Sequence, residues 1–320
     1  MPPAYATEEV IFHGYPARAL HSREAALTAV FTPQIGMLGC SLEHQGDELL
    51  GHRGGIARYE ATGSTMGIPL LHPWANRLAG LSYTAAGRTV KIDPDSPAVR
   101  TDPNGLPIHG LVNTSPHWEL AGAHADETSA RLSATLAFGA HPELLEAFPF
   151  PHSLAIDAAV HDATLTIRTT LTATGDSPVP VSFGYHPYFQ LPDVARADWH
   201  LQLPAMRRLV LDERMIPTGE TEAAEAYDGP LGEREYDDAY EGVGDGTRFV
   251  LAGGGRRIAV ELVDGYRYAV VYAPAGEDLI ALEPMTAPTN ALVSGNGLEL
   301  VPPGGTRSAT FAVAVEPQPA

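Results

Sequence analysis

Cysteine and lysine are almost absent from this 320-residue chain, and long apolar runs are missing. The single cysteine, Cys40, excludes an intrachain disulfide and a cysteine-based zinc site. The single lysine, Lys91, excludes a lysine-dependent phosphate loop and leaves one candidate for Schiff-base chemistry. No apolar run approaches the roughly 18 residues of a membrane span, and residues 1–15 lack the pattern of a signal peptide. We therefore expect a cytoplasmic protein.

Positive charge is also scarce. The chain has 20 basic and 39 acidic residues, which gives a formal net charge of −19 at pH 7. Nucleic acids and anionic membranes both require clustered Lys and Arg, so neither is an expected partner. The chain has no Gly-x-Ser-x-Gly motif and no glycine-rich loop between a strand and a helix. Serine hydrolases and nucleotide-binding folds are therefore disfavoured.

Glycine and proline, in contrast, are abundant, with 32 and 28 residues spread along the chain. They separate short segments with the alternating or β-rich pattern of strands. These segments are 26–32, 37–42, 131–138, 154–160, 164–172, 248–251, 258–263, 268–272, 279–282 and 306–315. Short strands joined by Gly/Pro turns indicate an all-β fold, a large antiparallel sandwich or barrel. All-β folds of this length often form one unit, so we expect residues 1–320 to be a single domain.

Helical periodicity is weak. It predicts a turn or two of helix at 142–148 and one turn at 231–236. Residues 212–245 are polar, acidic and glycine-rich, so we expect a long surface excursion there. Loops of that length inside a compact domain are often functional.

Three titratable residues share one sequence context. His109, His186 and Glu283 each follow an apolar, strand-like run and directly precede glycine or proline. A strand end with a fixed backbone is a good mount for a catalytic side chain. The apolar run before Glu283 favours burial, which raises a carboxyl pKa and makes a better base near neutral pH. Two histidines and a glutamate match a metal triad in composition, but their spacing does not, so we expect no metal.

The segment around His186 reads Phe-Gly-Tyr-His-Pro-Tyr-Phe-Gln-Leu over residues 183–191. Its aromatic faces suit a ring ligand with apolar C–H faces, such as a sugar. The alternative is a turn after a strand, with the aromatic rings in the core. In segment 67–78, Asn76 and Arg77 offer donors for hydroxyl or carboxylate recognition. His72 in the same segment is better explained as a structural histidine.

Five segments, taken in order, resemble the aldose 1-epimerase (galactose mutarotase) family. They are Gly-Ile-Pro-Leu-Leu-His-Pro-Trp-Ala-Asn-Arg-Leu at 67–78, Ile-His-Gly-Leu-Val at 108–112, Gly-Tyr-His-Pro-Tyr-Phe-Gln-Leu at 184–191, Tyr-Asp-Asp-Ala-Tyr at 236–240 and Leu-Glu-Pro-Met-Thr-Ala-Pro-Thr-Asn-Ala at 282–291. The resemblance implies a large antiparallel β-sandwich, the galactose mutarotase-like supersandwich, with a sugar site on its concave face. It also implies α/β interconversion of a hexose without a cofactor. A monosaccharide is the expected partner, and the chain is expected to be a monomer or homodimer.

The family's acid–base pair maps onto Glu283 as general base and His186 as general acid, and its second histidine maps onto His109. In the implied mechanism Glu283 takes the proton of the C1 hydroxyl while protonated His186 gives one to the ring oxygen. The free aldehyde then rotates and closes on the other face. His109 and Arg77 would stabilise charge that develops near the ring oxygen.

The implied sugar-binding residues are Asn76, Arg77 and Asp237, with Trp74 and Tyr185 as apolar platforms. Galactose-specific members have Asp-His where this chain has Asp-Asp at 237–238. They also have Asn-His-Ser-Tyr-Phe-Asn-Leu where it has Gly-Tyr-His-Pro-Tyr-Phe-Gln-Leu. These departures place the chain in a divergent branch and leave the choice of sugar open.

Three alternatives stay open. The chain could be a carbohydrate-binding protein that keeps the fold without turnover. It could be a hexose-6-phosphate mutarotase, whose cationic phosphate site would need Arg77, Arg207 or Arg208. It could also be a glycoside hydrolase or lyase, which needs a second carboxylate opposite Glu283.

Overall fold

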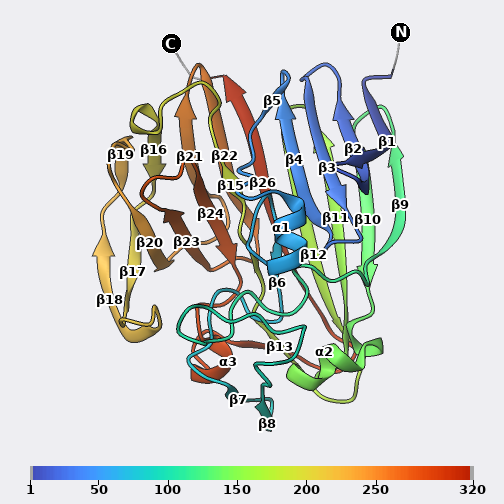
Figure 1. The fold of residues 1–320 in the computed structure, drawn as a ribbon, viewed down its shortest axis with the longest axis vertical. Coiled ribbons are helices and arrows are strands. Elements are labelled where there is room, and N and C mark those ends of the chain that lie inside the picture. Colours follow the sequence, from blue (N-terminus) through green and yellow to red (C-terminus); the bar gives the residue numbers. More distant parts are fainter. Residues whose placement is uncertain (1–2, 318–320) are drawn as a thin grey trace.

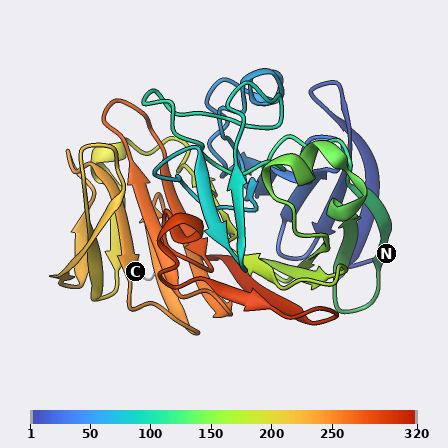
Figure 2. The ribbon, with the colours of Figure 1, turned by 90° about the horizontal axis from the view of Figure 1, so that it is seen from below.

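The computed structural model describes residues 3–317, and its strands form two layers that face each other (Figures 1 and 2). One layer is a nine-stranded antiparallel sheet. Its strands, in spatial order, are β19 (Tyr227–Pro230), β16 (His200–Leu203), β21 (Thr247–Gly253), β22 (Arg256–Asp264), β26 (Thr306–Pro317), β12 (Thr164–Ala173), β11 (His152–His161), β10 (Ala130–Leu136) and β9 (Glu119–Ala125).

The second layer joins two antiparallel sheets, which lie at opposite ends of the molecule in both views. The five-stranded sheet runs in chain order: β1 (Tyr5–Phe12), β2 (Tyr15–Ser22), β3 (Leu27–Thr32), β4 (Leu38–His44) and β5 (Asp47–Glu48). The eight-stranded sheet has the order β18 (Pro217–Ala224), β17 (Met206–Leu211), β20 (Tyr236–Glu241), β23 (Tyr268–Ala273), β24 (Ile280–Met285), β14 (Gly184–Tyr185) and β6 (Leu70–Leu71), with β15 (Tyr188–Phe189) also paired to β24. The isolated bridges Gly39–Ile68 and Leu50–Phe189 connect the two sheets.

The remaining elements are short. Two-stranded sheets pair β7 (Ser82–Ala85) with β8 (Arg88–Lys91) and β13 (Val179–Val181) with β25 (Glu299–Val301). The helices are α1 (Ile56–Thr62), α2 (Pro142–Ala147) and α3 (Ala291–Ser294), with 3₁₀ turns at Phe138–Ala140 and Arg196–Asp198. Within residues 3–317, no helix has the length and apolar character needed to cross a membrane.

The all-β, antiparallel sandwich expected from the sequence is confirmed. Each of the ten predicted strand segments coincides with a strand, and the helix expected at 142–148 is α2. Strand β12 shows why the alternation is informative. Leu165, Ile167, Thr169 and Leu171 are almost fully buried, whereas the alternate residues Thr166, Arg168 and Thr170 are more exposed.

Two expectations for residues 212–245 are wrong. The segment is not an irregular excursion, because β18, β19 and β20 all lie within it. Strand β18 forms a sheet edge, and most of its residues are exposed. Its threonines and glutamates therefore lack the apolar alternation of a half-buried strand, and the sequence indicated a loop instead. The helical turn expected at 231–236 is also absent; a non-helical turn precedes β20 there.

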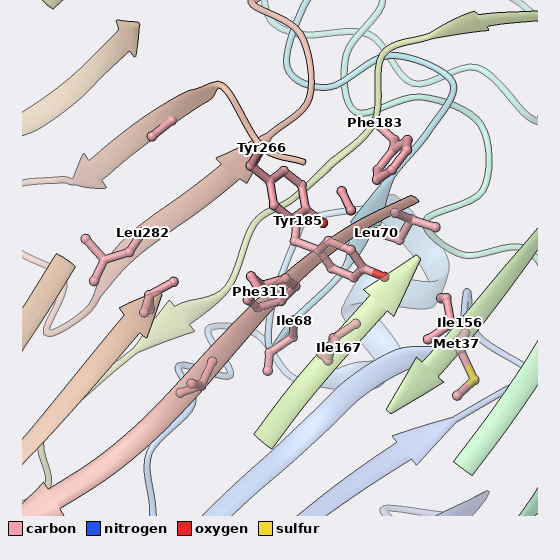
Figure 3. Close-up of a cluster of buried hydrophobic side chains, with 14 of the residues drawn as sticks. Met37, Ile68, Leu70, Ile156, Ile167, Phe183, Tyr185, Tyr266, Leu282 and Phe311 are labelled. Atoms are coloured by element: carbon pink, nitrogen blue, oxygen red, sulfur yellow. The ribbon is translucent and has the colours of Figure 1, made fainter. Parts of the chain in front are cut away.

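A hydrophobic core fills the space between the layers. Figure 3 shows part of it, where Tyr185, Leu282 and Phe311 lie among aliphatic side chains from both layers. Tyr185 packs against Phe311 with ring centroids 5.0 Å apart, and its hydroxyl is 2.6 Å from Thr169 Oγ1. This core covers one face of the eight-stranded sheet. Side chains that alternate with the core residues along β24 and β14 point to the other face, where the titratable groups gather.

Candidate active site

The pairing of β24 with β14 and β15 brings His186 and Glu283 together. Gly184 pairs with Met285 and Tyr188 pairs with Ala281 in the same register. His186 therefore lies directly across from Glu283. Opposed residues of antiparallel strands point to the same face with Cβ atoms about 5 Å apart. The register thus explains why side chains about a hundred positions apart in the sequence meet.

Two prolines open the hydrogen-bond ladder at this point. Leu282 N donates to Pro187 O at 3.3 Å, and Thr286 N donates to Phe183 O at 2.9 Å. Pro284, which lies between these two donors, has no N–H to complete the series. Pro187 likewise has no N–H to offer β24. Backbone hydrogen bonds therefore join the two strands on both sides of the His186–Glu283 pair, but the prolines leave none beside the pair itself.

The sequence led us to expect Glu283 at the end of a strand, but this expectation is wrong. Glu283 is within β24, paired with Val270 of the central strand β23. The glutamate-proline pair misled the prediction because proline usually marks a strand edge or end. Here its missing N–H falls where the ladder is already open, so the strand continues through Pro284.

His186 and Glu283 form the centre of the site. His186 Nε2 is 3.3 Å from Glu283 Oε1, and the two residues are 6% and 2% exposed. Tyr188 stacks on His186 with centroids 4.3 Å apart, and its hydroxyl is 3.2 Å from His186 Nε2. Among the described residues, His186 Nδ1 and Glu283 Oε2 have no hydrogen-bond partner. Such buried polar atoms normally have one, which makes these two atoms suited to ligand hydroxyls.

His109 packs against the pair edge-on, with its ring centroid 5.5 Å from that of His186. Its backbone has a φ of 64° and its N–H donates to Asn76 O at 2.8 Å. The next residue, Gly110, has a φ of 73°, and a Cβ there would lie 2.2 Å from His72 O. Only glycine fits this contact, which fixes the direction in which His109 projects.

Arg77 is held beside the same group of residues. Its Nε donates to the buried carboxylate of Asp102 at 3.1 Å, and its Nη1 donates to Asn76 Oδ1 at 3.0 Å. Asn76 is itself buried and has a φ of 57°. Both predicted binding residues are thus oriented by protein contacts.

The histidines and the glutamate of the site favour their neutral forms. Burial lowers the pKa of His186 well below its usual value, and nearby His109 and Arg53 lower it further. Burial and the Arg77 guanidinium lower the pKa of His109 to about 3. Burial raises the pKa of Glu283 well above its usual value, Asp237 raises it further, and Arg77 opposes the rise. These pKa directions favour a neutral imidazole on His186 beside a neutral carboxyl group on Glu283.

The strand register also separates the two aspartates of β20. Asp237 pairs with Tyr272, which pairs in turn with Ala281, two residues before Glu283. Asp237 thus shares the face of Glu283, and partial desolvation there raises its pKa. Asp238 points to the other face and pairs with Arg208 at 3.2 Å. Of the two, only Asp237 is placed to act with the acid–base pair.

Two predicted platforms are not on this face. Trp74 is 0% exposed and packs in the main hydrophobic core. Tyr185 is 2% exposed and lies in the core shown in Figure 3. Tyr185 immediately precedes His186, so strand alternation directs its ring away from the site. The expectation that these rings contact a sugar is therefore corrected.

Other side chains occupy the place expected of those platforms. Tyr188 and the half-buried Tyr272 both contact the His186 ring, Tyr272 edge-on at 5.9 Å. Arg53 forms a bidentate pair with Glu277, at 2.9 and 2.8 Å, and donates to the Tyr188 hydroxyl at 3.4 Å. Tyr188 could have been selected from the aromatic segment. Arg53 and Tyr272 carried no local sequence signal, because only long-range pairing brings them to the site.

Comparison with known proteins adds a family relationship. The family model described as aldose 1-epimerase matches residues 37–314, most of the chain. Among curated proteins, YihR of Escherichia coli K12 is 24% identical over 252 residues, which are 74% of this chain and 77% of YihR.

Solved structures share the fold over nearly the whole chain. The Slr1438 protein of Synechocystis sp. PCC 6803 is 26% identical, with a TM-score of 0.76 and coverage of 94% of this chain and 96% of that one. A galactose mutarotase-like protein of Clostridium acetobutylicum is 18% identical, with a TM-score of 0.83 and coverage of 98% and 99%. A galactose 1-epimerase of Lactobacillus acidophilus NCFM is 15% identical, with a TM-score of 0.78 and coverage of 98% and 100%.

Proposed function

The chain belongs to the aldose 1-epimerase family, and we propose that it interconverts the α and β anomers of a free hexose. The observation that carries this proposal is the buried contact between His186 and Glu283, 3.3 Å apart. Anomer exchange needs one group to take a proton from the C1 hydroxyl and another to give one to the ring oxygen. Both oxygens are bonded to the same carbon, so the two catalytic groups must lie side by side.

Burial favours the neutral pair, so the reaction begins when a proton passes from the Glu283 carboxyl group to His186, which gives an imidazolium and a carboxylate. Glu283 removes the C1 hydroxyl proton, and His186 protonates the ring oxygen as the C1–O5 bond breaks. The open-chain aldehyde rotates about the C1–C2 bond. Ring closure on the other face returns both protons, so the enzyme ends in its starting state. No atom is gained or lost, and positioned acid–base groups contribute about 10²–10⁴-fold in rate.

The surrounding residues support these two proton transfers. His109 is held neutral by its low pKa, so it can donate or accept a hydrogen bond without adding charge. The Arg77 guanidinium lies near Glu283 and favours the carboxylate that acts as base, because it opposes the rise in the pKa of Glu283. Tyr188 packs on the imidazole and fixes its plane. In this proposal Asn76 and Asp237 bind the remaining hydroxyls of the sugar.

A free sugar suits these contacts better than a phosphorylated one. Arg53 is already paired with Glu277, and Arg77 with Asp102, so both cations near the site have carboxylate partners. Arg208 pairs with Asp238 on the opposite face of β20. A phosphate group would have to break one of these pairs to be neutralised. We therefore propose an unphosphorylated hexose as the substrate.

The test is polarimetry on freshly dissolved α-anomers of glucose, galactose and their 6-phosphates. We expect the protein to accelerate the approach to anomeric equilibrium for at least one free hexose more than for its phosphate. Acceleration of the phosphates alone would overturn the choice of substrate. Sugar binding without acceleration of any aldose would indicate a binding protein, and release of reducing sugar from oligosaccharides would indicate a hydrolase.

A further inference from the structure

A second group of ligand-type side chains lies outside the proposed active site. His117 belongs to the connection between β8 and β9, while His141 and Glu143 lie at the start of α2. Figure 1 shows α2 at the end of the sandwich where this connection enters β9. The three side chains come from two segments that are separated along the chain, and their ligand atoms lie within 4.8 Å of one another.

The contacts within this group are close. His117 Nε2 is 2.8 Å from Glu143 Oε1, and His141 Nδ1 is 3.8 Å from the same oxygen. The two imidazoles stack with centroids 3.8 Å apart and an interplanar angle of 17°. The two imidazoles and the carboxylate thus place two nitrogens and one oxygen within 4.8 Å of one another.

These distances match the requirements of a small divalent ion. A tetrahedral zinc ion with bonds of about 2.1 Å needs its ligand atoms about 3.4 Å apart. The two measured separations from Glu143, 2.8 and 3.8 Å, lie on either side of that value. A turn of one imidazole about its soft Cβ–Cγ torsion would direct both nitrogens to the same ion. The side chains of His117, His141 and Glu143 are 32%, 24% and 46% exposed, so the ion can enter without unfolding.

We propose that His117, His141 and Glu143 form a surface site for a divalent transition-metal ion, with zinc as the representative ion. Two imidazole nitrogens and one carboxylate oxygen suit zinc, nickel and cobalt better than magnesium or calcium. Three protein ligands leave at least one coordination position for water. The site is distinct from the His186–Glu283 pair and independent of the proposed reaction.

The effect of the ion would be structural. His117 lies eight positions after His109 in the same connection, and that connection is already held at Ser115, whose carbonyl accepts from Gly36 N at 2.9 Å. A metal ion would join the connection to α2. Because the ion binds the folded arrangement and bridges distant segments, it would raise the free energy of unfolding.

The experiment is calorimetric titration of the metal-free protein with zinc chloride, together with thermal unfolding at increasing zinc concentration. We expect one zinc ion per chain and a melting temperature that rises with zinc. The double variant His117→Ala/His141→Ala should lose both effects. The matched control is His124→Ala, which removes an exposed histidine of β9 and should bind zinc like the wild type.

A second comparison separates this site from the active-site histidines. The variant His186→Asn should keep the zinc-dependent rise in melting temperature, because His186 is not a ligand in the proposal. The proposal is overturned if the double variant keeps the rise, if His186→Asn loses it, or if the wild type binds no zinc. Far-ultraviolet circular dichroism establishes that each variant is folded before titration.

Discussion

Two buried pairs in this protein each contain a histidine, and they differ in the residue that the histidine contacts. His186 contacts Glu283 at 3.3 Å, whereas His72 contacts His152 at 2.8 Å, Nε2 to Nε2. All four residues are almost fully buried, and burial lowers the pKa of each histidine. Burial and a low pKa therefore do not distinguish His186, the proposed catalytic histidine, from the structural pair.

The protons of the His72–His152 pair are fixed by its contacts. His152 Nδ1 is 2.6 Å from Phe150 O, which can only accept, so Nδ1 carries the hydrogen. His152 Nε2 must then accept from His72 Nε2–H. The rings of Phe138 and Phe148 enclose the pair. This agrees with the structural role expected for His72 from the sequence.

The His186–Glu283 pair has the opposite character. Its carboxyl group can hold a proton or give it up as a stable anion. Unpartnered buried atoms do not separate the two pairs, because His72 Nδ1 lacks a partner among the described residues, as do His186 Nδ1 and Glu283 Oε2. A pair of two imidazoles offers no stable anion for an acid–base cycle. The comparison indicates that the identity of the partner separates the two pairs better than burial or unpartnered atoms do.

The largest effect should come from removing the proton donor. His186→Asn keeps a polar side chain of similar reach but cannot donate a proton as imidazolium does. We expect kcat for mutarotation to fall by about 10²–10⁴-fold, measured by polarimetry above the spontaneous rate. If this variant kept the wild-type kcat, His186 would not be the proton donor and would no longer differ in role from His72.

Substitution in the His72–His152 pair should lower the free energy of unfolding and leave kcat unchanged. His152→Leu leaves the His72 Nε2–H without a partner in the core, which costs about 1–3 kcal/mol of unfolding free energy. Urea denaturation followed by tryptophan fluorescence measures this loss. The kcat of the folded protein should not change. A loss of kcat with unchanged stability would contradict the structural assignment.

The His72–His152 pair should also make the stability of the protein depend on pH. Burial lowers the folded-state pKa of His72 well below its usual value and that of His152 to about 4, whereas unfolded histidine titrates near pH 6.5. Stability is therefore complete above about pH 6.5 and falls as pH drops, by about 1.4 kcal/mol per pH unit for each proton taken up on unfolding.

The matched variant for this test replaces both partners, His72→Leu/His152→Leu, which leaves no unpaired imidazole. Urea denaturation at pH 7 and pH 5 should show a smaller loss of stability in the variant than in the wild type. Equal losses would mean that other groups, such as His186 and His109, account for the acid sensitivity.

The neighbouring aspartates of β20 provide a smaller contrast. Asp237→Asn removes a charge on the face of Glu283, and a hydrogen bond to a charged group contributes about 1.5–3 kcal/mol. We expect a higher KM with a smaller change in kcat. Asp238→Asn breaks a partly exposed ion pair with Arg208, which contributes at most about 1 kcal/mol, and should leave KM unchanged. Initial rates at varied sugar concentration measure both variants.

The smallest effect is expected for Tyr188→Phe. The ring that stacks on His186 remains, while the hydroxyl that contacts His186 Nε2 at 3.2 Å and Thr65 Oγ1 at 2.7 Å is lost. We expect a modest fall in kcat with a shifted pH profile, because the hydroxyl biases the protonation of the imidazole. An unchanged pH profile would mean that Tyr188 acts only through packing.

The sequence predicted the strands and the type of site better than the direction of side chains. Tyr185 and His186 are adjacent in one recognisable motif, yet strand alternation sends the first to the core and the second to the site. The motif contains both residues and does not say which face each one takes. Trp74 lies outside the strands, and its motif likewise did not show that its ring packs in the core.

Long-range pairing was the other part that the sequence could not supply. Glu283 was selected from its local context, but its opposition to His186 depends on the register between β24 and its neighbours. Arg53 and Tyr272 reach the site through that same pairing and carry no local signal. The edge strand β18 was missed because its exposed residues lack the alternation that a half-buried strand shows.

The most direct test of the catalytic pair is the variant Glu283→Gln. Glutamine preserves the shape of the side chain and can accept a hydrogen bond, but it cannot take the proton of the C1 hydroxyl. We expect its polarimetric rate to fall close to the spontaneous rate on every hexose that the wild type accelerates. The same preparation should unfold at least at the wild-type urea concentration, because the substitution removes a buried ionisable group. Full wild-type rate in this variant on all those sugars would contradict the central claim that Glu283 and His186 exchange protons with the substrate.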